Sequence, residues 1–204
     1  MTLPTPPGSL RRRSLLRALG VAALRALPGW GAATVLLGKA QPALASTPEL
    51  TVFDVGRDED GVNLSYAVEF ELGRSVDDAL VKSVPLFFVA EAEIFRDRWY
   101  WRDRRVAHAV RTWRIVYQPL TSTYRVTTIG GLSQNYATRV EAIASFSRVA
   151  RWKIAEPGQL EEGSRHYLEF QFRLDTTQLP RPMQIGISGE PDWQLSVKRT
   201  LRIN

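Results

Sequence analysis

The chain has 204 residues, with 27 basic and 21 acidic side chains, no cysteine and a sequence pI near 10.0. The lack of cysteine excludes disulfides, so a folded domain must be held together by its core alone. The positive charge belongs to the N-terminal segment, because residues 1–45 hold six basic side chains and no acidic one, which leaves 21 of each sign in residues 46–204. A neutral domain gives no support for a nucleic-acid partner or an anionic membrane partner.

Residues 1–45 have the three parts of a secretory signal peptide. A basic cluster begins at Arg11, an uncharged run covers residues 26–38, and Ala43-Leu44-Ala45 forms a small-x-small cleavage site. The uncharged run is shorter than the roughly 20 residues that span a bilayer. We therefore expect cleavage after Ala45 rather than an anchor, so that only the leader meets the membrane, and we expect residues 46–204 to form a single β-rich domain in the periplasm.

The export route has two interpretations. Residues 12–17 read Arg-Arg-Ser-Leu-Leu-Arg, which resembles a twin-arginine export motif. An ordinary arginine-rich leader of the general secretory route has the same basic cluster. Both routes stay open on the sequence.

The first elements of the domain are predicted to be a hairpin and a short helix. Residues 49–55 indicate a strand, and residues 62–72 alternate between apolar and polar side chains as a half-buried strand does, with a polar turn between them. Ser75, followed three residues later by Asp78, predicts an N-capped helix. That helix should end before Pro85, which disfavours helical backbone at Val84.

The longest pairing should lie between residues 84 and 120. Residues 86–96 and 104–118 both alternate with a period of two, which predicts two long strands. Pro119 ends the second strand because proline cannot donate a ladder hydrogen bond. Residues 97–103 contain no glycine or proline, so an ordered loop is expected there rather than a two-residue turn.

The second half of the chain predicts further strands and one more helix. Residues 123–129 and 132–136 should pair across a tight turn at Gly130-Gly131, and Thr138 with Glu141 forms a capping box. The helix that follows should bury one face made of Val140, Ile143, Phe146 and Val149. Strands are predicted at residues 152–155 and 166–174, a proline-bounded loop at residues 175–182, and a last strand over residues 193–203. Together these elements predict a mainly β fold, namely a two-layer antiparallel β-sandwich with two short helices, with an immunoglobulin-like arrangement as one option.

The residues that could support catalysis are few. The chain has no nucleophile elbow, no phosphate-binding loop and no dinucleotide fingerprint. His108 and His166 stand alone in sequence, so we expect solvated strand histidines, although two strands could bring them together. Asp175 and Asp192 flank one loop region and could form a carboxylate pair, yet loop aspartates more often accept turn and cap hydrogen bonds. No metal ion, cofactor or catalytic residue is predicted, and a non-enzymatic protein is favoured.

One segment has the composition of a binding surface. Between residues 96 and 105, arginines surround a Trp-Tyr-Trp run, and such side chains combine flat apolar area with forked hydrogen-bond donors. The alternative to a binding surface is a structural role, in which the segment forms a corner and the two tryptophans cover the end of the core. The candidate binding residues are Arg96, Arg98, Trp99, Tyr100, Trp101, Arg102, Arg104 and Arg105.

Several of these motifs resemble a proteobacterial family of domains of unknown function, numbered 4390. The similar segments are Pro85–Glu91, Arg98–Trp101, Arg111–Arg114, Tyr124–Val126 with Gly130–Leu132, and Leu174–Pro182 with Asp192-Trp193. Members of this family are sometimes labelled proline-rich signal peptide proteins. The resemblance implies an exported domain that is often encoded beside a sensor kinase pair of the nitrogen-regulation type. The family has no established activity, so the resemblance assigns no catalytic residues.

These observations lead to one functional hypothesis and two alternatives. The leading hypothesis is a periplasmic binding or adaptor module for a protein partner in the cell envelope, such as a sensor kinase. The first alternative is an envelope hydrolase that uses Asp175 or Asp192. The second is a carbohydrate-binding module, which would need the Trp99, Tyr100 and Trp101 rings exposed and coplanar.

Overall fold

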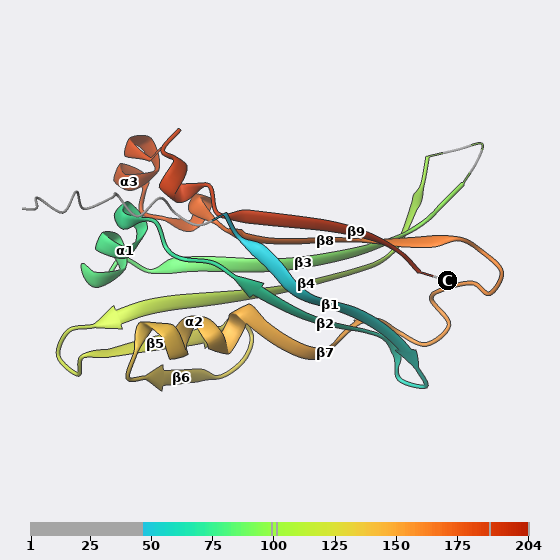
Figure 1. Ribbon diagram of the computed structural model, residues 1–204, viewed down its shortest axis with the longest axis horizontal. Coiled ribbons are helices and arrows are strands. Elements are labelled where there is room, and N and C mark those ends of the chain that lie inside the picture. Colours follow the sequence, from blue (N-terminus) through green and yellow to red (C-terminus); the bar gives the residue numbers. More distant parts are fainter. Residues whose placement is uncertain (1–46, 99, 101, 188, 204) are drawn as a thin grey trace, which may run out of the picture. The chain divides into compact units, whose positions relative to one another are not determined.

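The computed structural model describes residues 47–203, apart from residues 99, 101 and 188 (Figure 1). Within these residues the chain forms two antiparallel sheets, three α-helices and two single-turn 3₁₀ helices. The strands are β1 Glu49–Asp58, β2 Gly61–Glu69, β3 Leu86–Arg96, β4 Arg104–Gln118, β5 Thr123–Thr128, β6 Ser133–Tyr136, β7 Arg148–Ala155, β8 His166–Leu174 and β9 Ser196–Ile203. The helices are α1 Arg74–Val81, α2 Arg139–Ser147, η1 Thr176–Gln178, α3 Arg181–Gly186 and η2 Pro191–Trp193.

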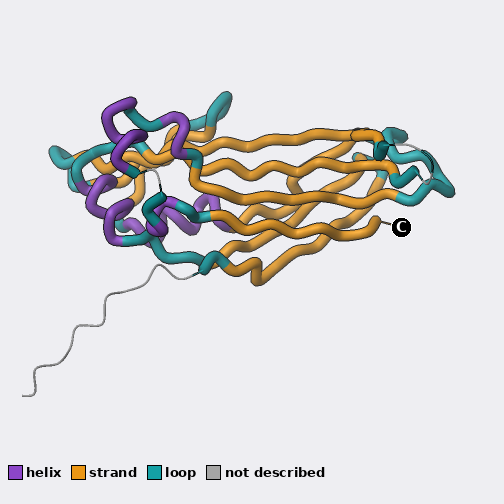
Figure 2. The backbone as a smooth tube through the Cα atoms, turned by 90° about the horizontal axis from the view of Figure 1, so that it is seen from above, coloured by secondary structure: helices purple, strands orange, loops and turns teal. Residues whose placement is uncertain are grey.

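The two sheets confirm the predicted mainly β sandwich. The smaller sheet has the order β1-β2-β7 and the larger has the order β6-β5-β4-β3-β8-β9 (Figures 1 and 2). An immunoglobulin constant domain has sheets of four and three strands, whereas the sheets here have three and six. None of the helices in the described part of the chain is both long enough and apolar enough to cross a bilayer.

The central hairpin forms with the predicted bounds. β3 pairs with β4 along its whole length and with β8 on its other side. The five even-numbered side chains from Leu86 to Ile94 point into the core and are fully shielded from solvent. Strand β3 is therefore the middle of the larger sheet and of the molecule's core.

Aromatic rings join the two sheets. Tyr66 on β2 lies 4.8 Å from the Phe170 ring on β8, measured between centroids, and Phe88 on β3 lies 4.8 Å from Phe146 on α2. Phe172 lies between these two pairs, 5.9 Å from Phe88 and 6.4 Å from Tyr66. One continuous apolar core therefore runs from the smaller sheet to the larger one, with α2 covering part of the larger sheet.

Strand β2 differs from the half-buried strand that its alternation predicts. Asn63 and Ala67, which should face solvent, are buried. β2 is the middle strand of its sheet, and Ala67 lies between Val52 of β1 and Arg148 of β7. A short side chain between two longer ones is covered by its neighbours, so position in the sheet outweighs the alternation.

Helix α1 is capped differently from the prediction. Its N-cap is Gly73, not Ser75, and the backbone N–H of Ser75 donates to the Asp192 carboxylate at 3.0 Å. The helix ends before Pro85 as predicted. Ser83, with φ of 65°, adopts the left-handed conformation that closes a Schellman motif, and the N–H of Val84 donates to the Ala79 carbonyl.

Helix α2 confirms the capping box and part of its predicted buried face. Thr138 accepts from the Glu141 N–H, and the Glu141 side chain accepts from the Thr138 N–H. The buried side chains are Ala142, Phe146 and Ser147, whereas Val140 is exposed. Of the predicted face, Phe146 is buried and Ile143 packs against the core, whereas Val140 is exposed and Val149 lies in β7 rather than in the helix.

The segment after β8 is helical where a loop was predicted. Asp175 caps η1, and Pro182 and Pro191 lie in the first turns of α3 and η2. Proline fits a first helical turn because its missing N–H has no partner there in any case. The predicted last strand also begins later, at Ser196, since Trp193 belongs to η2.

The turn between β5 and β6 needs one glycine rather than two. Gly131 donates its N–H to the Thr128 carbonyl at 2.9 Å, and Gly130, at the third position of this turn, has φ of 78°. Only a residue without a Cβ adopts that conformation without strain. Gly131 has no positive φ, so the turn depends on Gly130.

Candidate functional site

The predicted binding segment forms the loop between β3 and β4. It begins after Arg96 and ends before Arg104, at the end of β3 opposite α1 (Figure 1). Its described residues are 97, 98, 100, 102 and 103, and Trp99 and Trp101 lie outside the described residues. The predictions that those two rings are exposed, coplanar or part of the core therefore stay predictions.

The base of the loop is fixed by Asp103. One carboxylate oxygen of Asp103 accepts the backbone N–H of Arg98 at 3.1 Å, and the other accepts the Tyr167 hydroxyl at 2.8 Å. The Asp97 N–H donates to the Arg165 carbonyl at 2.9 Å. These bonds attach both ends of the loop to the start of β8 and close it across five residues.

Tyr167 stabilises this attachment in two ways. Its ring stacks on Phe95 with centroids 5.3 Å apart, and its hydroxyl donates to Asp103. Burial, together with the hydrogen bond to Asp103, raises the pKa of Tyr167 to about 12. The hydroxyl therefore keeps its proton, and its donor role, throughout the neutral pH range.

Two of the candidate residues are held in ion pairs. Arg96 pairs with Glu161 and its side chain is 20% exposed, whereas Arg105 pairs with Glu93 and its side chain is 54% exposed. Tyr100 is 75% exposed. Arg102 and Arg104 are also exposed, and Arg98 is partly exposed. The part of the described segment that an incoming molecule could touch is thus centred on Tyr100, Arg102 and Arg104.

The two candidate catalytic carboxylates act as helix-capping acceptors. Asp175 is buried and accepts from the Thr177 N–H at 3.1 Å, the Thr177 hydroxyl at 2.6 Å and the Gln178 amide at 2.9 Å. Burial alone would raise the pKa of Asp175, but these hydrogen bonds and the charge of Arg173 outweigh it and hold that pKa below the usual value. Asp192 accepts from α1. A general acid needs a raised pKa, so the shift at Asp175 has the wrong direction for that role.

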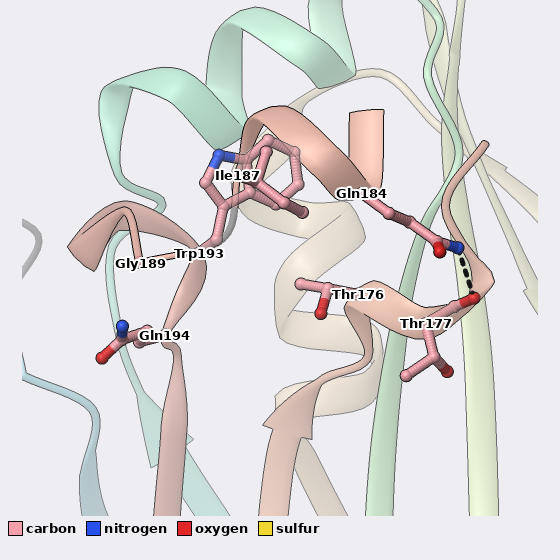
Figure 3. A pocket seen from close by; sticks show the side chains of 7 residues that line it. All are labelled: Thr176, Thr177, Gln184, Ile187, Gly189, Trp193 and Gln194. Carbon is pink, nitrogen blue, oxygen red and sulfur yellow. Dashed lines mark hydrogen bonds between the residues drawn. The ribbon is translucent and has the colours of Figure 1, made fainter. Parts of the chain in front are cut away.

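A pocket lies beside these aspartates without using them. It has a volume of about 280 Å³ and is formed by residues of η1, α3 and η2 and by residues that follow α3 and η2 (Figure 3). The Gln184 amide in its wall donates to the Thr177 carbonyl at 2.7 Å. None of the described residues that line it carries a carboxylate or an imidazole, so they do not form the acid–base pair of a hydrolase. These residues are Thr176, Thr177, Gln184, Ile187, Gly189, Trp193 and Gln194.

The two histidines lie on opposite faces of the larger sheet. His166 pairs with Arg96, an even-numbered position of β3, and faces inward, whereas His108 pairs with Glu93 and faces outward. His166 is buried, which corrects the expectation of a solvated histidine, and burial lowers its pKa. His108 is exposed as expected. Strand pairing therefore does not bring the two imidazoles together.

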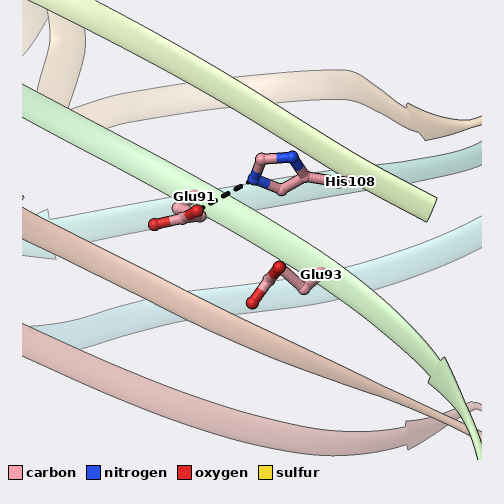
Figure 4. Close-up of side chains that lie close together, drawn as sticks. All are labelled: Glu91, Glu93 and His108. Carbon is pink, nitrogen blue, oxygen red and sulfur yellow. Dashed lines mark hydrogen bonds and ion pairs between the residues drawn. The ribbon is translucent and has the colours of Figure 1, made fainter. Parts of the chain in front are cut away.

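The structure brings His108 to a pair of glutamates that sequence reasoning missed. Its Nε2 atom lies 2.9 Å from an oxygen of Glu91, and Glu93 lies beside them (Figure 4). All three side chains belong to the polar faces that alternation predicts for the two strands. Their alignment depends on the pairing register, which a β-bulge shifts between Ile94 and Phe95.

Comparison with known proteins places the chain in one family. No curated protein and no solved structure matches the sequence. A family model described as "Domain of unknown function (DUF4390)" matches residues 45–203, which is most of the chain. The chain belongs to the DUF4390 family of domains of unknown function.

Proposed function

We propose that this protein is an exported, non-enzymatic binding module that recognises a protein partner in the cell envelope through the loop between β3 and β4. The observation that carries the proposal is the contrast within that loop. Its base is fixed to β8 by Asp103, while Tyr100 at its tip is 75% exposed. An aromatic ring held outward on an anchored base loses little freedom on binding, which favours recognition.

The chemistry of the tip suggests the kind of partner. Tyrosine and arginine are enriched among residues that dominate protein interfaces, and Arg102 and Arg104 follow Tyr100 at exposed positions. The guanidinium groups would pair with carboxylates of the partner. We therefore expect an acidic surface on the partner, and the extracytoplasmic domain of a neighbouring sensor kinase is our first choice.

Export to the periplasm is the second half of the proposal. It is supported by the basic cluster, the uncharged run and the Ala43-Leu44-Ala45 site in the leader. A domain without cysteine also folds independently of the oxidising conditions of that compartment. The mature protein recovered from the periplasm should begin at Ser46, as mass spectrometry of the purified protein will show.

Site-specific photocrosslinking tests the binding surface. A photoreactive phenylalanine analogue replaces Tyr100 in one full-length variant and Leu120 in a matched control. Leu120 is fully exposed and lies beyond the other end of β4, about 50 Å away at roughly 3.3 Å per residue. In cells, the variant at position 100 should crosslink to the sensor kinase and the control should not. Equal crosslinking from both positions would contradict a specific surface on this loop.

A binding measurement with purified components follows. Tyr100→Ala with Arg102→Ala should weaken capture of the kinase domain by about 2 kcal/mol or more, roughly 30-fold in Kd, as interface anchors do. Trp99→Ala with Trp101→Ala should weaken it likewise. The thermal midpoint should stay close to that of the wild type in both cases. A collapse of the midpoint in the tryptophan double variant would show that those rings belong to the core.

A further inference from the structure

The outer face of the larger sheet carries a compact set of potential metal ligands. Glu91 and Glu93 project from β3, and His108 projects from β4 directly opposite Glu93 (Figure 4). One ligand atom from each of the three side chains lies within 4.8 Å of the other two. None of these residues belongs to the binding loop proposed above.

We propose that Glu91, Glu93 and His108 bind one divalent transition-metal ion, with zinc as the best match. An imidazole nitrogen combined with carboxylate oxygens suits zinc, whereas calcium and magnesium prefer oxygen ligands alone. Three protein ligands leave the fourth tetrahedral position to water. Because the side chains lie on the solvent-facing side of the sheet, that position is open.

The distances require only small side-chain movements. A tetrahedral zinc ion with bonds of about 2.1 Å separates its ligand atoms by about 3.4 Å. The Nε2 atom of His108 is 2.9 Å from the nearest Glu91 oxygen, and the whole set lies within 4.8 Å. Rotation about the side-chain bonds of the two glutamates is enough to reach this spacing.

The backbone beneath the ligands is fixed on three sides. β3 is hydrogen-bonded to β4 and to β8 along this stretch, and Ala90, Ala92 and Ile94 on its opposite face are fully buried. The Cα positions of the two glutamates and the histidine therefore cannot spread apart when an ion binds. Rigid strands hold metal ligands more accurately than loops do.

Local electrostatics also favour a cation here. Glu93 on β3 is paired with Glu169 on β8, and like charges directly opposite each other destabilise a sheet. Arg105 offsets part of this charge through its ion pair with Glu93, and His108 hydrogen-bonds to Glu91. A bound zinc ion would replace the bond between His108 and Glu91 and would compete with Arg105 for Glu93.

Calorimetry with the full-length protein tests the site. After dialysis against a chelator, titration with zinc chloride should show one ion bound per chain. Cobalt, which replaces zinc in such sites, should give the intense visible absorption of tetrahedral Co²⁺. Absence of binding by both ions would overturn the proposal.

Three variants assign the binding to these residues. His108→Ala and Glu91→Gln should each weaken zinc binding by about 100-fold or more, since even outer residues that orient metal ligands contribute 10- to 100-fold. Both positions are partly exposed, so the metal-free fold should persist, as circular dichroism will show. Arg105→Ala should act in the opposite direction, strengthening zinc binding roughly two- to fivefold by releasing Glu93 from a surface ion pair.

The second histidine supplies the matched control. His166→Gln should leave zinc affinity unchanged, because His166 lies on the core-facing side of the larger sheet, opposite the proposed site. If zinc binds wild type but its affinity does not change in His108→Ala or Glu91→Gln, the ion lies elsewhere and the proposed site is wrong. A loss of binding in His166→Gln with a normal fold would lead to the same conclusion.

Discussion

At the scale of single residues, three aspartates stabilise a loop and the starts of two helices. Asp103 closes the loop between β3 and β4, Asp175 caps η1, and Asp192 caps α1. In each case, a carboxylate accepts backbone N–H groups that have no partner in a strand or helix. Only the local cap at Asp175 follows from sequence patterns, since Asp192 lies 117 residues from the N–H group that it accepts.

Gly73 makes the cap at Asp192 possible. A Cβ atom at position 73 would lie 2.5 Å from the Asp192 Cγ atom, which is too close for any real contact. Asp192→Ala and Gly73→Ala should each lower the free energy of unfolding by about 1 kcal/mol, the usual value of an N-cap. The double variant should lose less than the sum, because both changes remove the same hydrogen bond. Urea unfolding measures all three, and Gly56→Ala, which meets no atom within 4 Å, is the control.

His166 should make the fold sensitive to mild acid. Burial lowers its pKa in the folded protein below the usual value of about 6.5. As pH falls through 6.5, the unfolded chain takes up a proton that the folded protein still excludes, so stability decreases until the folded-state pKa is passed. Asp175, whose pKa is also lowered, adds a separate loss only below its ordinary value of 3.8.

Comparing unfolding at pH 7.5 with unfolding at pH 5 isolates the histidine. His166→Gln should reduce the difference in unfolding midpoint between these two pH values, because glutamine does not titrate. An unchanged pH difference in His166→Gln would mean that another group causes it.

At the scale of elements, the sequence predicts long regular strands better than it predicts their alignment. The bounds of β3, β4 and β8 agree with their alternating patterns, because a strand with one buried face carries that period in its own residues. The bulge between Ile94 and Phe95 has no such pattern. If the register of the Arg96–Arg104 pair continued without the bulge, His108 would pair with Ala92 and face the core. The cluster of His108 with the two glutamates therefore depends on that bulge.

Helix α3 shows the other limit of sequence reasoning. The prolines at positions 180, 182 and 191 indicate a loop when proline is treated as a helix breaker. In the structure, two of these prolines occupy the first turns of short helices instead. The buried face of α2 was predicted only in part: Phe146, which packs on Phe88, is buried, whereas Val140 in the first turn is exposed.

The C-terminal cap of α1 contains a correctable strain. Ser83 adopts a positive φ of 65°, which costs an ordinary residue roughly 1 kcal/mol relative to glycine. Ser83→Gly should therefore raise the unfolding midpoint in urea at unchanged slope. Ser83→Val should lower it, because a β-branched side chain is less tolerated there. A lower midpoint for the glycine variant would show that the serine side chain has a stabilising contact.

At the scale of the whole molecule, stability rests on one core shared by both sheets. Phe172 is fully buried and its ring packs beside Phe88, Phe146 and Tyr66, which come from three other elements. Phe172→Ala should therefore cost about 3–5 kcal/mol. Phe95→Ala, near the end of β3, should cost less, because Phe95 is only half-buried and packs mainly on Tyr167. Chemical denaturation of the two variants compares them directly.

The leader can be tested on the whole chain as well. Arg12→Lys with Arg13→Lys should abolish export if the twin-arginine route is used, and should leave it intact if the general secretory route is used. Fractionation of cells into periplasm and cytosol measures the outcome. Protein found in the cytosol with residues 1–45 attached, in an otherwise wild-type chain, would contradict export altogether.

The position of β8 beside β3 also constrains how the chain acquires its structure. Strand β3 pairs with β8, whose residues follow about 80 positions later in the chain, and its buried row of side chains is complete only after that pairing. While the chain is being synthesised, β3 therefore lacks its β8 partner until nearly the whole chain has left the ribosome. Exposed apolar strands of this kind are prone to aggregation. Fragments that stop before residue 166 should depend on chaperones or be degraded, so the shortest segment able to fold unaided should include the complete larger sheet.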